Sequence, residues 1–286
     1  MPKRRHEILR LLVLAAVAAP LAAQGTTNAH SARLANQALH GDKAALTHLE
    51  RSASNGDANA QAALGHVLSQ RHQYSQALPW LKKAARGGNS VGEYDLGYAY
   101  VMGQGVSQNY VKAVYWWKKA AVQGSAPGET SMGLAHYRGQ GVPLNYVRTD
   151  YWWKKAAAQG YVLAESDLGL AYYRGQGVPQ NYVKADYWDK KAAAQGYVPA
   201  ESDLGLAYYR GQGVPQNYVK ADYWWKKAAA QGFSRGEFGL GLSYYFGQGV
   251  PQSSTKALYW LKKVTAQGGS WKKVAQQDID FIERRG

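Results

Sequence analysis

Histidine, aspartate, glutamate and serine are the residues of this chain that could carry chemistry, and their spacing assembles no catalytic site. We expect no H-E-x-x-H zinc site and no G-x-S-x-G nucleophile site, and no S-x-x-K is accompanied by its partner motifs. Cysteine is absent, which excludes disulfides, thiolate-held metals and a cysteine nucleophile. We therefore expect no enzyme activity, no catalytic residue, no cofactor and no metal site. We expect the histidines that follow residues 1–23 to lie at the surface or at helix ends. They are His30, His40, His48, His66, His72 and His136.

Two recurring patterns could still suggest a ligand site. A Gly-Gln-Gly triplet begins at Gly103 and recurs four more times. It follows a predicted helix and lacks the third glycine of a dinucleotide fingerprint, so its context does not favour phosphate binding. A series of glutamates falls in the first turn of predicted helices, where a negative charge complements the helix dipole. These are Glu93, Glu129, Glu165, Glu201 and Glu237.

The elements that must position these residues follow a 36-residue repeat. Residues 161–196 and 197–232 differ at only two places, where Leu163 and Asp189 correspond to Pro199 and Trp225. Fixed periods of this size are typical of stacked supersecondary units. One glycine recurs at each 36-residue step, at Gly97, Gly133, Gly169, Gly205 and Gly241.

Each repeat is predicted to form a helical hairpin. In residues 197–232, apolar residues at i, i+4, i+7 and i+8 from Ala200 lie on one face of a first helix, which ends at Gly211. Asn217 is a suitable N-cap for a second amphipathic helix, which ends at Gly232. Such a hairpin can bury its apolar faces only against itself and its neighbours.

The pattern A-x-x-x-L-G-x-x-Y-x-x-G-x-G-V-P-x-N-x-x-K-A-x-x-W-W-x-K-A-A-x-Q-G resembles the Sel1-like repeat family, closely over residues 57–268 and loosely over about 29–56. The resemblance implies an all-α fold, a right-handed α/α superhelical solenoid that acts as a non-catalytic adaptor or scaffold for other proteins. Cysteine-rich members have been linked to β-lactam binding or hydrolysis, and a chain without cysteine is a poor match to them.

The domain organisation expected from the repeat is a segment with a degenerate repeat at 24–56, six repeats, and a capping helix at 269–286. Trp271, Ala275, Ile279 and Ile282 form the apolar stripe of this last helix. The six repeats are expected at 57–88, 89–124, 125–160, 161–196, 197–232 and 233–268.

Residues 1–23 are predicted to be a signal peptide, because basic residues precede an apolar stretch at 11–19 and small residues end it. We expect export, to the periplasm or beyond, with no transmembrane anchor after cleavage. Without Lys3, Arg4, Arg5, Arg10 and Glu7 the formal charge falls from +15 to +12. Export argues against nucleic acid as a partner, and an anionic envelope polymer such as a glycan, lipid headgroups or an acidic protein fits the charge better. The alternative is that the lysines only keep the outer faces of the helices hydrated.

The candidate partner-binding residues lie on the first helices, opposite the apolar stripe at 100° per residue. The resemblance implies that these helices line a concave face, and leucine, tyrosine and arginine are typical of protein interfaces. The alternative is that superhelical packing buries much of this row. The candidates are Tyr94, Tyr98, Leu134, Tyr137, Arg138, Leu170, Tyr173, Arg174, Leu206, Tyr209, Arg210, Phe238, Leu242 and Tyr245.

The second helices carry an outward row of tyrosines beside lysines, which could contact sugar rings or simply cover apolar surface. This row is Tyr115, Tyr151, Tyr187, Tyr223 and Tyr259. The favoured function is a protein-binding scaffold, the alternative is binding of envelope polysaccharide or peptidoglycan, and a hydrolase ranks third. Asp189 stands where other repeats have tryptophan or leucine, on the predicted buried side of its helix.

Overall fold

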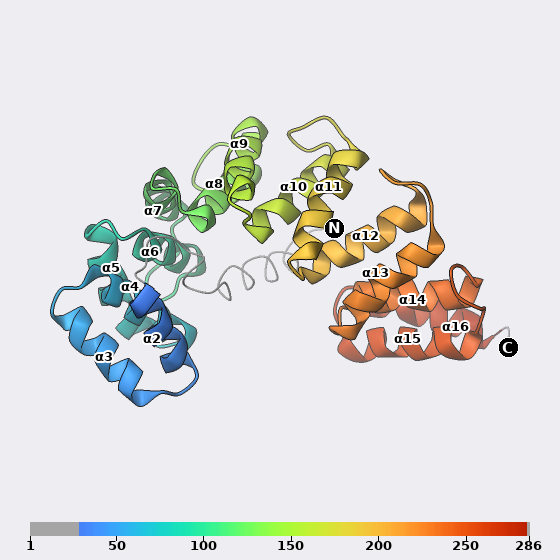
Figure 1. Ribbon diagram of the computed structural model, residues 1–286, viewed down its shortest axis with the longest axis horizontal. Helices are drawn as coiled ribbons and strands as arrows, with labels where there is room; N and C mark the ends of the chain where they lie inside the picture. The colour runs from blue at the N-terminus through green and yellow to red at the C-terminus, as the bar shows by residue number, and fades with distance from the viewer. Residues whose placement is uncertain (1–28, 285–286) are drawn as a thin grey trace. The chain divides into compact units, whose positions relative to one another are not determined.

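The computed structural model describes residues 29–284, so the predicted signal peptide, residues 1–23, lies outside the described range. Over residues 29–284 the chain forms 15 α-helices and no strand, which confirms the predicted all-α repeat solenoid (Figure 1). The helices are α2 Ala29–Leu39, α3 Lys43–Ser54, α4 Ala58–Gln70, α5 Tyr74–Arg86, α6 Ser90–Met102, α7 Tyr110–Val122, α8 Ala126–Arg138, α9 Tyr146–Ala158, α10 Val162–Arg174, α11 Tyr182–Ala194, α12 Val198–Arg210, α13 Tyr218–Ala230, α14 Ser234–Phe246, α15 Ser254–Gln267 and α16 Lys272–Glu283.

The described residues divide into two compact units, 29–164 and 165–284. The first contains α2 to α9 and the start of α10, and the second contains the rest of α10 and α11 to α16. Each repeat has a first helix and a second helix, named in chain order. In residues 198–230, for example, α12 is the first helix and α13 the second.

Helix ends follow from capping residues that the sequence makes visible. Helix α12 ends at Arg210, and Gly211 adopts the left-handed conformation (φ 68°) while its N–H donates to the carbonyl of Ala207. Helix α13 begins after Asn217, whose side chain accepts a hydrogen bond of 2.9 Å from the backbone N–H of Lys220. Both ends agree with the predicted boundaries.

The recurring glycine is required because a side chain of the second helix packs directly against it. That side chain is a tryptophan at Gly97, Gly133 and Gly205, Asp189 at Gly169 and Leu261 at Gly241. A methyl group added at Gly205 would lie 2.3 Å from the indole ring of Trp225, and one at Gly133 would lie 2.4 Å from that of Trp153. The indole of Trp153 also donates its N–H to the carbonyl of Thr130 at 3.2 Å. The two helices of a hairpin therefore approach closely at this glycine.

The Gly-Gln-Gly triplet is a packing element between repeats. Its second glycine has positive φ, and a methyl group added at Gly213 would lie 2.2 Å from the carbonyl oxygen of Tyr182 in the preceding repeat. Gly141 lies in the same way against Tyr110. The loop thus rests on the start of the preceding second helix.

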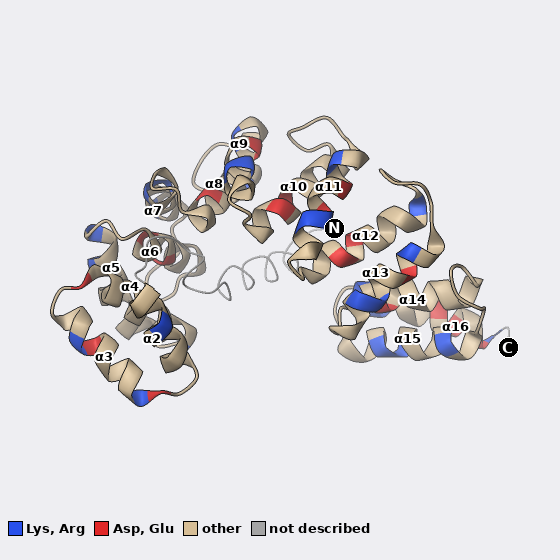
Figure 2. Cartoon of the chain, in the orientation of Figure 1, with Lys and Arg blue, Asp and Glu red and all other residues tan. Residues whose placement is uncertain are grey.

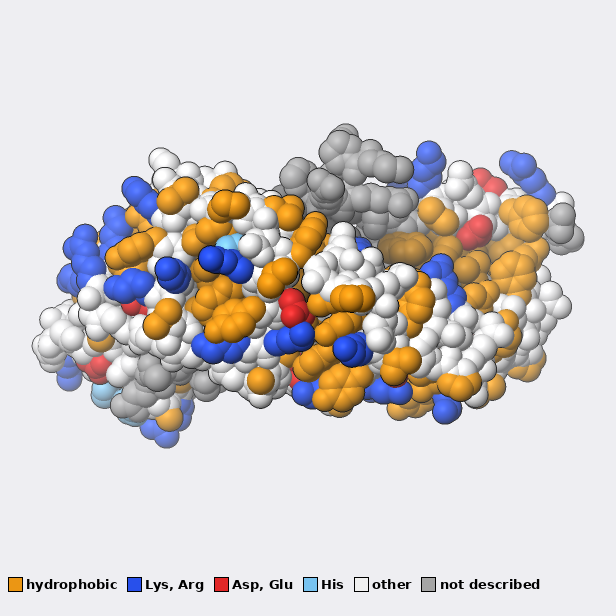
Figure 3. Space-filling view, turned by 90° about the horizontal axis from the view of Figure 1, so that it is seen from above, with side chains coloured by type: hydrophobic (Ala, Val, Ile, Leu, Met, Phe, Trp, Pro, Cys, Tyr) orange, Lys and Arg blue, Asp and Glu red, His pale blue; other side chains and the backbone are white. Residues whose placement is uncertain are grey.

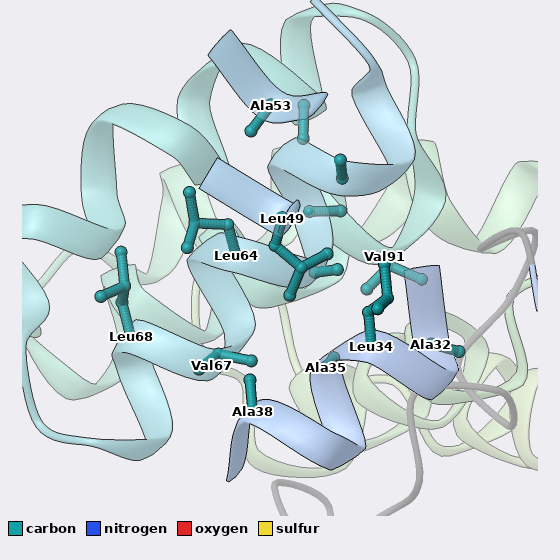
Figure 4. Packing of buried hydrophobic residues seen from close by; sticks show 14 of the residues in the cluster. Ala32, Leu34, Ala35, Ala38, Leu49, Ala53, Leu64, Val67, Leu68 and Val91 are labelled. Carbon is teal, nitrogen blue, oxygen red and sulfur yellow. The ribbon is translucent and has the colours of Figure 1, made fainter. Parts of the chain in front are cut away.

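Each unit has its own buried apolar clusters. In residues 29–164, Leu49, Leu64, Val67 and Val91 pack together with alanines of α2 to α4 (Figure 4). In residues 165–284, α16 buries Ala275, Ile279 and Ile282 against Leu261 and Val264 of α15. The predicted apolar stripe of the last helix therefore covers the preceding repeat.

Candidate functional site

The fourteen predicted partner-binding residues, which we call the first-helix row, lie at the edge of the packed interior. Eleven of them are half-buried, Arg174 and Arg210 are exposed, and Tyr94 is buried. The half-buried members are Tyr98, Leu134, Tyr137, Arg138, Leu170, Tyr173, Leu206, Tyr209, Phe238, Leu242 and Tyr245.

The prediction that Tyr94 faces a partner is wrong. Its side chain is 2% exposed and packs in a cluster with Trp117 and Met132. Burial raises the pKa of Tyr94 well above its ordinary value. The helical wheel correctly identified the side of α6 that packs against the second helix of its own hairpin. In a stack of hairpins, however, α6 also buries another side against the next repeat, and Tyr94 lies on that side. The equivalent Thr130 and Ser202 are buried as well.

The tyrosines of the first-helix row support the core tryptophans from the solvent side. The ring centroids of Tyr137 and Trp153 are 5.5 Å apart, and those of Tyr209 and Trp225 are 5.4 Å apart. Burial raises the pKa of the Tyr209 hydroxyl, and burial of Tyr98 raises its pKa to about 12. These rings therefore contribute to packing and leave only part of their surface for a partner.

A polar link orients one arginine of the row. Arg210 donates from Nη1 to the hydroxyl of Tyr173 at 3.0 Å, and that hydroxyl donates to Oε1 of Gln212 at 3.4 Å. The link joins α10 to α12 within residues 165–284. The guanidinium of Arg210 is therefore held in place while its residue stays exposed.

The C-terminal end of the row is partly covered by α16. Phe238 contacts Trp271 with ring centroids 4.9 Å apart, and Tyr245 contacts Phe281 at 6.1 Å. The surface available on the first helices of residues 165–284 is therefore centred on Leu170, Leu206 and the two arginines rather than on Phe238 and Tyr245.

The series of glutamates is a structural clasp that the helix dipole does not explain alone. Glu129 has a fully buried side chain, lies 2.9 Å from Nζ of Lys155, and accepts a hydrogen bond of 2.8 Å from Nε2 of Gln159. Bonding to Glu129 raises the pKa of Lys155. The same three-residue clasp recurs with Glu93, Lys119 and Gln123; Glu165, Lys191 and Gln195; Glu201, Lys227 and Gln231; and Glu237, Lys263 and Gln267.

The lysine of the clasp also lies over the ring of a tryptophan. The ammonium of Lys227 lies 5.1 Å from the ring centroid of Trp224, and that of Lys155 lies 5.6 Å from the ring of Trp152. Each clasp ties the first turn of the first helix to the last turn of the second. The glutamine of the clasp could be recognised in the sequence, because a terminal Gln-Gly recurs in each repeat. The sequence did not indicate that this glutamine bonds to the glutamate of the first helix.

Removing one clasp should destabilise its hairpin. We expect Glu201→Ala to lower the free energy of unfolding by about 1–2 kcal/mol, because Gln231 loses its acceptor while the half-exposed Lys227 can regain water. Urea denaturation followed by circular dichroism measures the change. Lys226→Ala, which removes a neighbouring exposed lysine outside the clasp, should change stability by less than about 0.5 kcal/mol. Equal losses in both variants would contradict the role of the clasp.

Two histidines are buried. His66 lies within α4, contrary to the expectation of a surface or helix-end position, whereas His136 lies in the last turn of α8. Nδ1 of His66 lies 2.9 Å from Oδ2 of Asp95, and Nδ1 of His136 lies 3.4 Å from the carbonyl oxygen of Pro143. Burial lowers the pKa of His136. Within residues 29–284 no group of three or more histidine, aspartate or glutamate side chains is placed to hold a metal ion.

One segment, Gly88 to Gly92, matches the G-x-S-x-G motif of serine hydrolases, a match that the expectation of no catalytic motif overlooked. It joins helix α5 to helix α6 rather than a strand to a helix. Ser90 is 1% exposed, and the side chain of Asn89 caps α6 by accepting from the N–H groups of Val91 and Gly92. These five residues form a helix start and not a nucleophile elbow.

These observations define the class of protein: an α-solenoid of helical hairpins whose first helices carry a mixed apolar and basic row. Six consecutive segments match the Sel1 repeat, and the chain belongs to the Sel1 repeat family. The matched segments are 58–89, 90–125, 126–161, 162–197, 198–233 and 234–269.

Two crystal structures illustrate the likeness. A protective antigen present in uropathogenic Escherichia coli strains is 36% identical, with a TM-score of 0.74 over 83% of this chain and 51% of that one. The chain thus spans about half the length of that antigen. A Sel1 repeat protein from Oxalobacter formigenes is 31% identical, with a TM-score of 0.71 over 78% of this chain and 87% of that one. No curated protein matches the chain significantly. None of the helices in residues 29–284 is both long and apolar enough to span a membrane.

Proposed function

We propose that this chain is an exported, non-catalytic scaffold that binds a segment of another protein on its first helices. Membership of the Sel1 repeat family supports binding as the role, and the basic and apolar pattern of residues 1–23 supports export. The observation that carries the proposal is the exposed arginine pair beside half-buried leucines, with Arg210 held by Tyr173.

The physical argument concerns preorganisation. Arginine side chains lose conformational freedom when they bind, so a guanidinium already fixed by a hydrogen bond binds at a lower entropic cost. Half-exposed Leu170 and Leu206 supply apolar surface beside it. A partner segment with apolar side chains flanked by carboxylates would satisfy both features.

Site-specific photocrosslinking in living cells identifies which face is occupied. A photoreactive phenylalanine analogue at Leu170 or Leu206 should give a discrete protein adduct. The same analogue at Tyr223 or Tyr259, on the second helices, should not. Adducts from the second helices alone would refute the proposed site.

The affinity of variants for the partner identified in this way then tests whether Leu206 and Arg210 contribute to binding. We expect the Leu206→Ser, Arg210→Ser double variant to bind at least about tenfold more weakly, because central interface residues are each worth ~2 kcal/mol or more. Tyr209 is left unchanged because it packs on Trp225, so its truncation would also loosen the core. The control is Tyr187→Ser with Tyr223→Ser on the second helices, which should bind normally. Calorimetric titration measures both.

A further inference from the structure

The second helices present a row of apolar residues that the fold does not use. Val219, Tyr223 and Lys226 lie within about 60° of one another around α13, on the side away from the buried Ala221 and Trp225. We call the equivalent residues of α7, α9, α11, α13 and α15 the outer ridge. They are Val111, Tyr115, Lys118 and Val122; Val147, Tyr151 and Lys154; Val183, Tyr187 and Lys190; Val219, Tyr223 and Lys226; and Tyr259 and Lys262.

The ridge is strongly exposed in every repeat that has it. Its tyrosines are 55–57% exposed, and its valines are 66–76% exposed. Single exposed apolar residues are ordinary, whereas the same valine and tyrosine in consecutive repeats form a patch of the kind that marks an interaction surface. Valine is also a weaker helix former than lysine or glutamate, so helix stability does not account for it.

A half-buried tryptophan lies beside each ridge tyrosine. The rings of Tyr115 and Trp116 meet edge to face at 5.0 Å, and those of Tyr223 and Trp224 meet in the same way at 5.2 Å. The ridge thus combines valine, tyrosine, tryptophan and lysine. This is the composition that membrane-surface helices place at the boundary between headgroups and acyl chains.

The second helices carry a net positive charge. Helices α7, α9, α11, α13 and α15 carry 15 lysines and arginines against four aspartates. Five of those lysines are held by the buried glutamates of the clasps, which leaves ten basic residues to four acidic ones on these helices. Three of the five ridge lysines also form ion pairs at the surface, Lys154 with Asp150, Lys190 with Asp186 and Lys262 with Glu283. Figure 2 shows Lys and Arg on α7, α9, α13 and α15. On the face seen in Figure 3, hydrophobic and basic side chains are interspersed, with few acidic ones among them. The surface therefore complements a negatively charged one.

A sugar polymer is the competing occupant, and the ring contacts disfavour it. The ammonium groups of Lys119, Lys191 and Lys263 lie over the rings of Tyr115, Tyr187 and Tyr259 at 5.8–6.0 Å from the centroids. One face of these tyrosine rings is therefore already occupied, so a sugar could stack only on the other. The exposed valines offer nothing to sugar hydroxyls but fit acyl chains.

We propose that the outer ridge of each unit docks on the surface of a lipid bilayer that contains anionic lipids. Valine and tyrosine side chains enter the boundary region of the bilayer, and the lysines contact the anionic headgroups. This surface is separate from the first-helix row, so a scaffold bound through its second helices would leave the first helices free for a protein.

Cosedimentation with vesicles tests the proposal on the full chain. The vesicles are phosphatidylcholine alone, or phosphatidylcholine with phosphatidylglycerol. We expect binding to the second kind, weakened by salt, and at least about tenfold weaker binding by a variant with Val147, Tyr151, Val183, Tyr187, Val219 and Tyr223 all replaced by serine. Every variant keeps the same N-terminal residues, so the difference arises from the ridge.

A second measurement separates insertion from charge attraction. Acyl-chain-brominated lipids should quench tryptophan fluorescence of the unsubstituted chain, because Trp152, Trp188 and Trp224 border the ridge. The Leu206→Ser, Arg210→Ser variant is the matched control and should bind vesicles normally. Four results would overturn the proposal: no vesicle binding, equal binding by the ridge variant, binding only to isolated peptidoglycan, or self-association without lipid that the ridge variant abolishes.

Discussion

Asp189→Trp should raise the free energy of unfolding by about 1–3 kcal/mol. Asp189 is 7% exposed, and its carboxylate lies against Gly169 as the indole of Trp225 lies against Gly205. The substitution installs the side chain that the neighbouring, nearly identical repeat already accommodates. It buries apolar surface and removes a poorly solvated carboxyl group.

The raised pKa of Asp189 determines how the stability gained by Asp189→Trp changes with pH. Burial, and then the nearby Asp203 and Asp186, raise the pKa of Asp189 well above its ordinary value, while Arg235, which forms an ion pair with Asp203, lowers it. A carboxyl group with a raised pKa in the folded state favours folding below its unfolded pKa, and that contribution is lost as the pH rises through the folded pKa. The advantage of Asp189→Trp should therefore grow from acidic to neutral pH.

Thermal melts of three variants at several pH values separate the two causes. Asp189→Asn removes the charge and should recover only the pH-dependent part. Trp225→Asp makes the reverse change in the matched repeat and should destabilise it. An unchanged or lowered melting temperature for Asp189→Trp at neutral pH would show that Asp189 is well accommodated.

Gly205→Ala should lower the free energy of unfolding by about 1–3 kcal/mol, and Gly169→Ala should cost clearly less. At Gly205 the new methyl group meets the rigid indole of Trp225 at 2.3 Å. At Gly169 it meets Oδ1 of Asp189 at 2.2 Å, but a carboxylate at the end of a short side chain can rotate away. Replacing glycine within a helix also recovers up to ~1 kcal/mol.

Urea denaturation midpoints of the two alanine variants provide the comparison. The double variant Gly169→Ala, Asp189→Trp is the decisive control, because it restores the close contact and should be worse than either single change. If the two single variants lost the same stability, the glycine would serve the helix backbone rather than the tryptophan.

Features fixed within one repeat could be predicted from the sequence, and features that depend on stacking could not. Gly211 and Asn217 marked helix ends correctly because caps act within a few residues. The burial of Tyr94 depends on a neighbouring hairpin, and a single-helix wheel contains no information about that neighbour. The partner of the buried His66, Asp95, likewise belongs to the following repeat. The clasp is an exception, because it lies within one repeat but joins residues about 30 positions apart on two helices, which the pattern of a single helix does not show. The first-helix row remains a prediction as a binding site.

The clasp has a consequence for how such an array changes length during evolution. Glu201, Lys227 and Gln231 all belong to one repeat, so a duplication of any whole repeat copies a complete clasp. The new hairpin is closed by its own residues from the moment it arises, and only its contacts with its neighbours have to be shared. Gain or loss of whole repeats therefore preserves every clasp, whereas an insertion within α12 or α13 would shift Glu201 out of register with Lys227 and Gln231. The near identity of residues 161–196 and 197–232 fits a copy of this kind, with Asp189 as one of its two later changes.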